Sequence, residues 1–418
     1  MDIKNFQLFM LNKFNFSNNP IDAVAILFLT TTILLSPFYI FSSGVAQPSH
    51  YIMALCALAL MTLKRNDFTN LLKKQKISII FLLLICTINL VHGLNSHAIN
   101  FFINSAYWIY NFTILFGVIL IASETKYYKI IRNLIFTSFS LIIILYFLGL
   151  GEFKYPPRYN GFFNSPNQIG YYTILMLIVF FLTNNKKFNT LFFIIYAFAL
   201  FIIYLSGSRS VYLAILSLIF LFLLMPNTNF KDISLLFLIP FVVFFLTKIP
   251  TLENKNYFLK DGDGLDVKNT VIAEHTLKRT KRLFDKGWKD DELYSIKYQL
   301  DARGYDRLYK YPQFLIYGAG QGNDNRFITE LMSGRTDGHN YEMHSSLFAV
   351  LFYYGFIGLI LFLKTIYNFF LFKKNIIFLL PIFIYGLFTY GLRTPYFWFA
   401  LGFIVLMSDV FKSTKKTK

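Results

Sequence analysis

The stretch LFFIIYAFALFIIYLSGSRSVYLAILSLIFLFLLM, from Leu191 to Met225, decides the fold class of this chain. Two apolar blocks without a charged residue, Leu191–Leu205 and Val211–Met225, flank a short polar turn that contains Arg209. Continuous apolar runs are typical of helices surrounded by lipid, whereas water-facing helices alternate apolar and polar faces. Each block is shorter than the ~20 residues that a straight span needs, so we expect its ends to extend into the polar flanks. The stretch predicts two membrane-spanning helices joined by a tight turn.

The composition of the whole chain excludes an ordinary soluble protein. By length alone, 418 residues would suggest about three soluble domains of ~150 residues each. Yet 56% of the residues are hydrophobic and 20% are aromatic. Only 15% are charged, whereas soluble chains carry about 25%. The two cysteines, Cys56 and Cys86, both lie in apolar runs, so no disulfide framework is expected. We therefore expect an all-α polytopic membrane protein.

Twelve apolar blocks of this kind predict twelve transmembrane helices. A long polar segment separates the ninth block from the tenth. The predicted spans are Ile21–Phe41, Tyr51–Leu63, Ile77–Val91, Phe101–Ala122, Leu134–Leu150, Ile169–Leu182, Leu191–Leu205, Val211–Met225, Ile233–Leu246, Ser345–Leu363, Ile376–Tyr390 and Pro395–Met407. The chain is thus divided into an N-terminal segment (1–20), nine helices (21–247), a loop subdomain (248–344), three helices (345–410) and a tail (411–418).

Lysine and arginine residues orient these helices, because cytoplasmic loops are enriched in positive charge. One set of loops, together with both termini, holds twenty of the 40 Lys and Arg residues, whereas the short loops on the other side hold four. The other sixteen lie in segment 248–344, which is nearly neutral because it also holds fifteen acidic residues. We therefore expect cytoplasmic termini and an outward-facing loop subdomain, which in a bacterium lies in the periplasm. The net charge of +18 then follows from membrane topology, and no nucleic-acid partner is expected.

Charged side chains are absent from the interiors of the predicted spans, so we expect any chemistry at the outer membrane surface. Ion-driven transporters usually need an ionisable group inside the membrane, which argues against that class. Arg158, Arg209 and Arg393 each lie in a short outer loop, where arginine is normally depleted. Arginine suits phosphate because its planar fork donates two parallel hydrogen bonds and keeps its charge. Together the three arginines suggest a bound anion. For any one of them, lipid headgroup contact or snorkelling is the favoured explanation, except for Arg209, because Ser206–Ser210 is rich in donors.

The long outer segment adds two further arginines in the sequence Asp301-Ala-Arg-Gly-Tyr-Asp-Arg307. Residues Thr276–Leu308 are predicted to be helical, and a spacing of four would then put Arg303 and Arg307 on one helix face. The alternative to anion binding is a solvated face that is salt-bridged to the neighbouring aspartates. The glycine-rich stretch Gly318–Gly322 that follows predicts a flexible turn.

A histidine and a glutamate at the end of this segment are candidates for a general base. In Gly338-His-Asn-Tyr-Glu-Met-His-Ser-Ser346, His344 lies at the mouth of the tenth predicted span, and Glu342 is two residues away. A histidine accepts a proton near neutral pH, and either side chain would serve as a base. The alternative for His344 is a helix-start residue that bonds to the backbone. His339, Glu342 and His344 match no strong zinc spacing, so neither a metal ion nor another cofactor is expected.

Four stretches between Arg158 and Leu363 carry a family resemblance. They are NGFFNSPN (Asn160–Asn167), SGSRS (Ser206–Ser210), RGYDR (Arg303–Arg307) leading to GAGQG (Gly318–Gly322), and EMHSS (Glu342–Ser346) followed by YGFIG (Tyr354–Gly358). Their order, with a long outer loop late in the chain, resembles the O-antigen polymerase and O-antigen ligase family of bacterial polysaccharide assembly. The resemblance implies a C-type glycosyltransferase-like fold in the bacterial inner membrane, with its active site facing the periplasm.

The resemblance also implies a reaction. In that family a glycan on undecaprenyl pyrophosphate is the donor, a sugar hydroxyl attacks the anomeric carbon, and the lipid pyrophosphate leaves without a metal ion or nucleotide sugar. Matched onto this sequence, Arg209 with Arg303 or Arg307 would hold the pyrophosphate, and His344 would lie near the acceptor hydroxyl, with Glu342 as the alternative base. The other candidate substrate contacts are Arg158 and Arg393 for the pyrophosphate, and Asn160, Asn167 and His339 elsewhere.

The choice of acceptor separates polymerases, which use another lipid-linked repeat, from ligases, which use lipid A-core. The RGYDR and EMHSS blocks look closer to polymerases, and ligases tend to have a His-x-His form that His339 and His344 do not make. We therefore expect a polymerase, with a ligase as the alternative. A lipid-linked oligosaccharide flippase or exporter is the alternative from another class, and a non-catalytic scaffold would leave the outer arginines unexplained. The expected partners are undecaprenyl-pyrophosphate-linked oligosaccharide, membrane lipids and, as a further candidate, a chain-length regulator protein.

Overall fold

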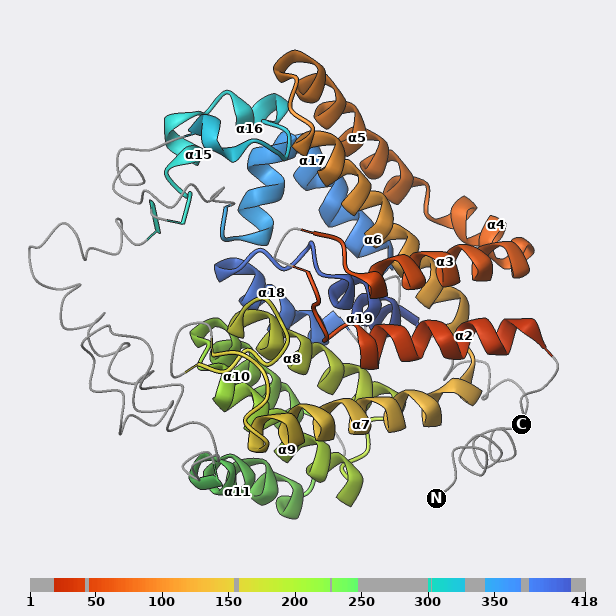
Figure 1. Cartoon of the computed structure of the whole chain (residues 1–418), viewed down its shortest axis with the longest axis vertical. Helices are drawn as coiled ribbons and strands as arrows, with labels where there is room; N and C mark the ends of the chain where they lie inside the picture. Colours follow the sequence, from red (N-terminus) through yellow and green to blue (C-terminus); the bar gives the residue numbers. More distant parts are fainter. Residues whose placement is uncertain are drawn as a thin grey trace, which may run out of the picture.

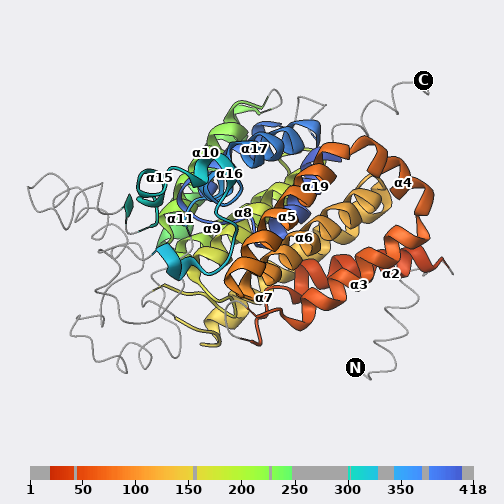
Figure 2. The same ribbon diagram turned by 90° about the horizontal axis from the view of Figure 1, so that it is seen from above.

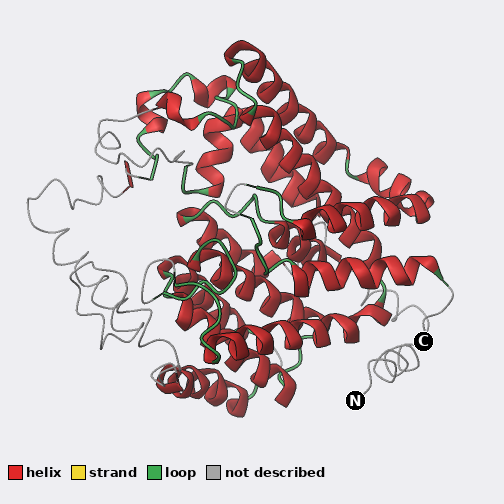
Figure 3. Ribbon diagram, viewed as in Figure 1, coloured by secondary structure: helices red, strands yellow, loops and turns green. Residues whose placement is uncertain are grey.

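The structure, a computed structural model, describes most of the chain and is helical there. The described residues are 19–41, 45–153, 158–225, 228–246, 300–301, 303–327, 343–369 and 376–406. Within these ranges Figure 3 shows helices joined by loops, and strand-like pairing is confined to one antiparallel bridge between Glu152 and Gly161. The predicted all-α class is therefore confirmed for the described residues.

The first half of the chain forms a row of neighbouring helices. Their bounds are α2 Pro20–Thr30, its π-helical extension η1 Thr31–Leu35, α3 Pro48–Leu63, α4 Arg65–Lys74, α5 Lys76–Ser96, α6 Asn100–Ala122, η2 Thr125–Tyr127 and α7 Tyr128–Phe147. Helices α2, α3, α6 and α5 follow one another in space in Figures 1 and 2, and consecutive members pack together.

The second half of the chain builds the rest of the bundle around one central helix. The bounds are α8 Pro166–Thr183, α9 Thr190–Ser206, α10 Arg209–Leu223, α11 Phe230–Leu246, α15 Arg307–Lys310, α16 Phe314–Tyr317, η5 Asp324–Phe327, α17 Ser346–Phe369, η6 Ile376–Phe378, α18 Leu379–Phe388 and α19 Pro395–Leu406. Helix α8 is buried along nearly its whole length and contacts α7, α9, α10, α18 and α19. It is therefore the buried centre of this part of the bundle (Figure 1).

The surface of the bundle is apolar, as expected of a protein that faces lipid. Large apolar side chains such as Leu55, Leu83 and Phe237 are more than half exposed, whereas a soluble protein rarely exposes so large an apolar surface. Five helical segments are long and apolar enough to cross a membrane: Lys76–Ser96, Asn100–Ala122, Thr125–Phe147, Pro166–Thr183 and Ser346–Tyr367. Each of the other predicted spans also contains a helix, but these helices are shorter. The structure thus supports a helical membrane protein.

Ion pairs join the loops that are predicted to be cytoplasmic. Lys126 Nζ lies 2.7 Å from Asp22 Oδ1 at the start of α2 and 2.8 Å from Glu124 Oε2, and Lys64 also pairs with Glu124. The Tyr127 hydroxyl donates a 2.6 Å hydrogen bond to Asp22. Burial acts to raise the pKa of Glu124, but hydrogen bonds from Lys126 and Lys64 outweigh it, and the pKa is lowered overall. The three loops therefore meet at one end of the bundle, as the alternating topology requires.

The stretch Gly318–Gly322, which the sequence predicts as a flexible turn, is instead a buried, packed loop. The Gln321 backbone N–H donates a 2.8 Å hydrogen bond to Asn89 Oδ1 on α5, and Trp108 Nε1 on α6 donates to Gln321 Oε1 at 2.9 Å. Gly318 has a φ of +82°, and a Cβ atom there would lie 2.6 Å from the Tyr353 carbonyl oxygen on α17. The glycines thus allow close backbone approach, which fastens the outer segment to three helices.

Candidate functional site

Arg158 connects the beginning of α8 to the turn between α9 and α10. Its Nε donates to the Ser206 carbonyl oxygen at 2.9 Å, and a terminal nitrogen donates to Asn167 Oδ1 at 2.7 Å. The Tyr385 hydroxyl on α18 donates to the Asn167 carbonyl oxygen at 3.4 Å. Arg158 and Asn167 are therefore held together at the end of the bundle where α8 begins.

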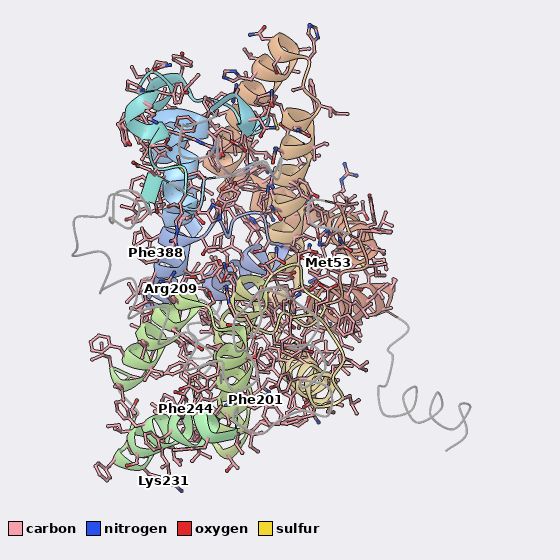
Figure 4. All side chains as sticks on the ribbon, turned by 60° about the vertical axis from the view of Figure 1, so that its left-hand side comes forward. Met53, Phe201, Arg209, Lys231, Phe244 and Phe388 are labelled. Carbon is pink, nitrogen blue, oxygen red and sulfur yellow. The ribbon has the colours of Figure 1, made fainter. Side chains whose placement is uncertain are left out.

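Arg209 is the first residue of α10, at the same end. Helix α9 ends because Gly207 adopts a left-handed conformation (φ +53°), and the extended Ser208 then precedes a new helix. The Arg209 side chain is half-buried, and Ser210 Oγ lies 3.3 Å from Thr389 Oγ1 just after α18. Figure 4 shows Arg209 beside Phe388, the last residue of α18, and far from Lys231 on α11.

Arg303 and His344, which are far apart in the sequence, meet through their backbones. The His344 N–H donates a 3.0 Å hydrogen bond to the Arg303 carbonyl oxygen, and the His344 side chain is exposed. Residues 303–306 form a turn in which Gly304 has a φ of +84°. The prediction that Arg303 and Arg307 share a face of one helix is therefore wrong, since the helix begins only at Arg307.

Hydroxyl groups connect the Arg303–His344 pair to Arg209. Ser346 Oγ, at the start of α17, donates to the Thr389 carbonyl oxygen at 3.2 Å and accepts from the Gly391 N–H at 3.1 Å. Thr389 in turn contacts Ser210, the neighbour of Arg209. We call Arg158, Arg209, Arg303 and His344 the arginine–histidine site, because this network brings their segments to the end of α18.

The beginnings of several helices contribute positive potential to this site. Helices α8, α10 and α17 begin at Pro166, Arg209 and Ser346, and α19 begins at Pro395 just after the Gly391–Thr394 turn. The N-terminus of a helix carries a partial positive charge and presents unpaired N–H groups, which favour a bound anion. Added to three arginines, these helix ends make the site suited to a phosphate or pyrophosphate group.

Arg307 has a different environment from the other arginines. Its side chain is 1% exposed, and its guanidinium pairs with Asp324 Oδ1 at 2.9 Å. The Tyr353 hydroxyl also donates to Asp324 Oδ1, at 2.7 Å, and the Arg307 guanidinium lies over the Phe327 ring. Arg307 is thus a buried partner of a carboxylate, so we leave it out of the anion site.

The remaining predicted site residues lie elsewhere in the described structure or outside it. A terminal nitrogen of Arg393 donates to Asn104 Oδ1 on α6, so this arginine is directed away from α18. Asn160 is fully buried, and its amide donates to the Phe163 carbonyl oxygen at 2.6 Å, which closes a local turn. His339 and Glu342 lie outside the described residues.

Other charged groups in the outer segment serve local structure. Burial raises the pKa of Asp306, although Lys310 Nζ lies 3.5 Å from its Oδ2 atom and opposes the change. The Tyr309 hydroxyl donates to Asp301 at 2.8 Å, and this hydrogen bond raises the pKa of Tyr309 to about 12. Over the described residues, no three His, Cys, Asp or Glu side chains gather closely enough to hold a metal ion.

Sequence reasoning missed Thr389 and Ser346 as the connectors of the site. Ser346 belongs to the EMHSS block, but its two hydrogen bonds to the end of α18 depend on tertiary packing. Thr389 carries only a weak signal, a polar residue at the outer end of an apolar run. A scan against protein-family models finds no match for the chain, and a search of curated proteins finds no similar sequence.

Proposed function

We propose that the chain is a polysaccharide polymerase that works without a metal ion at the outer face of the bacterial inner membrane. It transfers a glycan from undecaprenyl pyrophosphate to a sugar hydroxyl of another lipid-linked repeat. The single observation that carries this proposal is the meeting of Arg303 with His344, joined through Ser346 and Thr389 to the turn that holds Arg209. A cation cluster and a proton acceptor at one end of an apolar bundle are what this reaction needs.

The chemistry explains why arginines and a histidine suffice. The acceptor oxygen bonds to the anomeric carbon while the bond from that carbon to the pyrophosphate oxygen breaks and its electron pair leaves with the pyrophosphate. This leaving group is already a stable anion, so it needs fixed positive charge and no proton donor. The proton of the acceptor hydroxyl passes to the exposed imidazole of His344. Glu342, outside the described residues, is the alternative base.

The proposal includes the membrane arrangement that the sequence predicts. Twelve spans with cytoplasmic termini put the arginine–histidine site and segment 248–344 in the periplasm. The ion-paired loops around Glu124 and Lys126 at one end of the bundle support this arrangement, because the predicted cytoplasmic loops meet there. The apolar stretch of each donor and acceptor lipid then stays in the membrane while its sugar chain reaches the site.

The test is a set of single substitutions in the strain that makes the polysaccharide. We expect Arg209→Ala, Arg303→Ala and His344→Ala each to remove long-chain surface polysaccharide, since loss of one charged or basic contact lowers such rates by about 10²–10³-fold. Lys231→Ala is the matched control, because this exposed lysine lies far from Arg209 (Figure 4). Immunoblots of membrane fractions check that all four variants reach normal levels.

Gel analysis of a deletion strain separates the polymerase from its alternatives. If the chain is a polymerase, the deletion strain makes core that carries a single repeat. If it is a ligase, the deletion strain makes bare core and accumulates lipid-linked polymer. Full-length chains in the His344→Ala strain would remove this residue from catalysis. Activity that disappears in chelator and returns with a divalent cation would contradict the metal-independent mechanism.

A further inference from the structure

A second group of polar side chains lies on the other side of the Gly391–Thr394 turn. Tyr39 follows η1, Tyr107 and Tyr110 are on α6, and Tyr396 is the second residue of α19; we call these four residues the tyrosine cluster. The hydroxyls of Tyr39 and Tyr396 lie 2.7 Å apart, and the Tyr110 hydroxyl donates to the Met53 sulfur at 3.6 Å. The guanidinium carbon of Arg393 lies 5.8 Å from the centre of the Tyr107 ring.

A histidine on α3 adds a directed donor to this cluster. The rings of His50 and Tyr110 are 5.6 Å apart, and the Gln47 N–H donates to His50 Nδ1 at 3.2 Å. Because Nδ1 accepts a hydrogen bond, the proton of the neutral ring lies on Nε2. Among the residues that the structure describes, no acceptor contacts this buried Nε2 atom. The cluster therefore presents aromatic faces together with a donor that a ligand oxygen would satisfy.

Two ordinary explanations for tyrosines at a membrane surface fit this cluster poorly. Tyrosines of an interfacial belt have largely exposed rings, and Tyr51 fits this pattern with 61% of its surface exposed. Tyr39, Tyr107 and Tyr110 are instead half-buried, and the Tyr39 hydroxyl meets that of Tyr396. Tyrosines used for core packing are fully buried, as in the stacked pair Tyr171 and Tyr385, 3.9 Å apart. Tyr396 is also fully buried and forms the inner side of the cluster, whereas the other three tyrosines keep part of their surface exposed.

We propose that the tyrosine cluster, with Arg393 and His50, is a subsite that binds the sugar chain of the acceptor. Ring faces stack on the apolar face of a sugar, while hydroxyl, guanidinium and imidazole groups bond to its hydroxyls. The Gly391–Thr394 turn gives the connection to the reaction, because the Gly391 N–H bonds to Ser346 near His344, and Arg393 of the same turn faces the cluster. This inference rests on the proposed function and assigns a place to its second substrate.

The first experiment measures saccharide binding without any turnover. The probe is the free oligosaccharide repeat, released by mild acid from the strain's own surface polysaccharide, and the readout is saturation-transfer NMR with purified protein in nanodiscs. We expect the wild-type protein to bind the probe. Tyr107→Ala and Arg393→Ala should each weaken binding roughly tenfold or more, because each removes one stacking or charged contact with the sugar. Tyr51→Ala is the matched control, since this tyrosine follows His50 on α3 but is 61% exposed.

The second experiment measures transfer kinetics with two lipid-linked repeats. We expect Tyr107→Ala to raise KM for the acceptor roughly tenfold with kcat nearly unchanged, and Tyr107→Phe, which keeps the ring, to recover most of the affinity. Recovery by Tyr107→Phe, with a normal gel-filtration profile for both variants, excludes misfolding as the cause.

The outcomes separate this inference from the proposed function. Saccharide binding that Tyr107→Ala weakens, in a protein without transferase activity, supports the subsite and contradicts the polymerase. Normal acceptor KM and normal probe binding in both Tyr107→Ala and Arg393→Ala overturn the subsite and leave the polymerase standing. An equal loss in Tyr51→Ala would also overturn it, because a general membrane role of tyrosine would then explain the effect.

Discussion

Arg303 and Arg307 are close in the sequence but do different work. Arg303 is half-buried, and its carbonyl oxygen receives the His344 N–H. Arg307 is fully buried against Asp324 and Tyr353, so its charge is used inside the protein. The Tyr353 hydroxyl is also 3.4 Å from the Met343 N–H, next to His344. The buried Arg307–Asp324 pair therefore holds Tyr353 in place, and Tyr353 in turn contacts the backbone next to His344.

The Arg307–Asp324 pair makes a prediction about stability. Arg307→Ala leaves a buried carboxylate without its cation, and we expect a loss of about 3–5 kcal/mol in folding free energy. Thermal unfolding of the detergent-solubilised protein measures the change. The double variant Arg307→Met with Asp324→Leu removes both charges, and it should recover much of the lost stability. A single variant that melts like the wild type would show that the pair contributes little.

For single residues, the sequence predicts which side chains are candidates for the site but not what each of them does. The arginines of the outer loops and His344 stand out, because charge is rare at the outer surface of an apolar chain. The separate roles of Arg303 and Arg307 depend on Asp324, which the local sequence does not connect to either residue. Asn160 shows the same limit, since its block stands out in the sequence but its amide closes a local turn. Burial and partners are tertiary properties that no spacing reveals.

The helices show why apolar runs predict this fold well and its loops poorly. A run of apolar residues inside lipid has to satisfy its backbone internally, so each predicted span contains a helix. The ends of the helices depend instead on single residues. Ser165 caps the start of α8, and Gly207 ends α9 just before α10 begins. Because glycine signals a turn, the sequence predicts a flexible Gly318–Gly322 loop. The loop is instead buried and packed against α5, α6 and α17.

The packed loop can be tested by adding one methyl group. Gly318→Ala puts a Cβ atom 2.6 Å from the Tyr353 carbonyl oxygen, at a φ of +82° that disfavours side chains. We expect a loss of about 1–3 kcal/mol from backbone strain alone, read as a lower melting temperature. Ile316→Ala is the control, because this neighbouring side chain is 70% exposed. Equal melting temperatures for Gly318→Ala and the wild type would show that the loop is loosely packed.

The whole molecule has two ends with different chemistry. Lys64, Lys126 and their carboxylate partners join the start of α2 to the α3 and α6–α7 loops at one end. At the other end lie Arg158 and Arg209, beside the starts of α8 and α10 and the hydroxyl groups of Ser210 and Thr389. The positive-inside rule predicts that the first end faces the cytoplasm, and we therefore propose that the arginine–histidine site faces outward. This asymmetry follows from the sequence, whereas the meeting of the outer loops around α18 follows from helix packing.

Cysteine labelling tests this orientation. In a chain with Cys56→Ser and Cys86→Ser, we expect a membrane-impermeant maleimide to label Asn95→Cys in cells with a permeabilised outer membrane. Lys73→Cys, exposed on α4, should react only after the inner membrane is opened. Lys73 lies on α4 just before α5 begins at Lys76, and Asn95 lies at the far end of α5, so the two positions report opposite ends of α5. Labelling in the reverse order would put the arginine–histidine site in the cytoplasm.

The most direct test of the central claim is the binding of undecaprenyl pyrophosphate to purified protein in nanodiscs. If Arg209 and Arg303 hold the diphosphate, each alanine variant should bind it at least about tenfold more weakly than the wild type, and Lys231→Ala should bind it normally. The affinity of the wild-type protein for undecaprenyl pyrophosphate should also fall at high salt, because the attraction is electrostatic. Wild-type affinity in the Arg209→Ala and Arg303→Ala proteins would contradict the account.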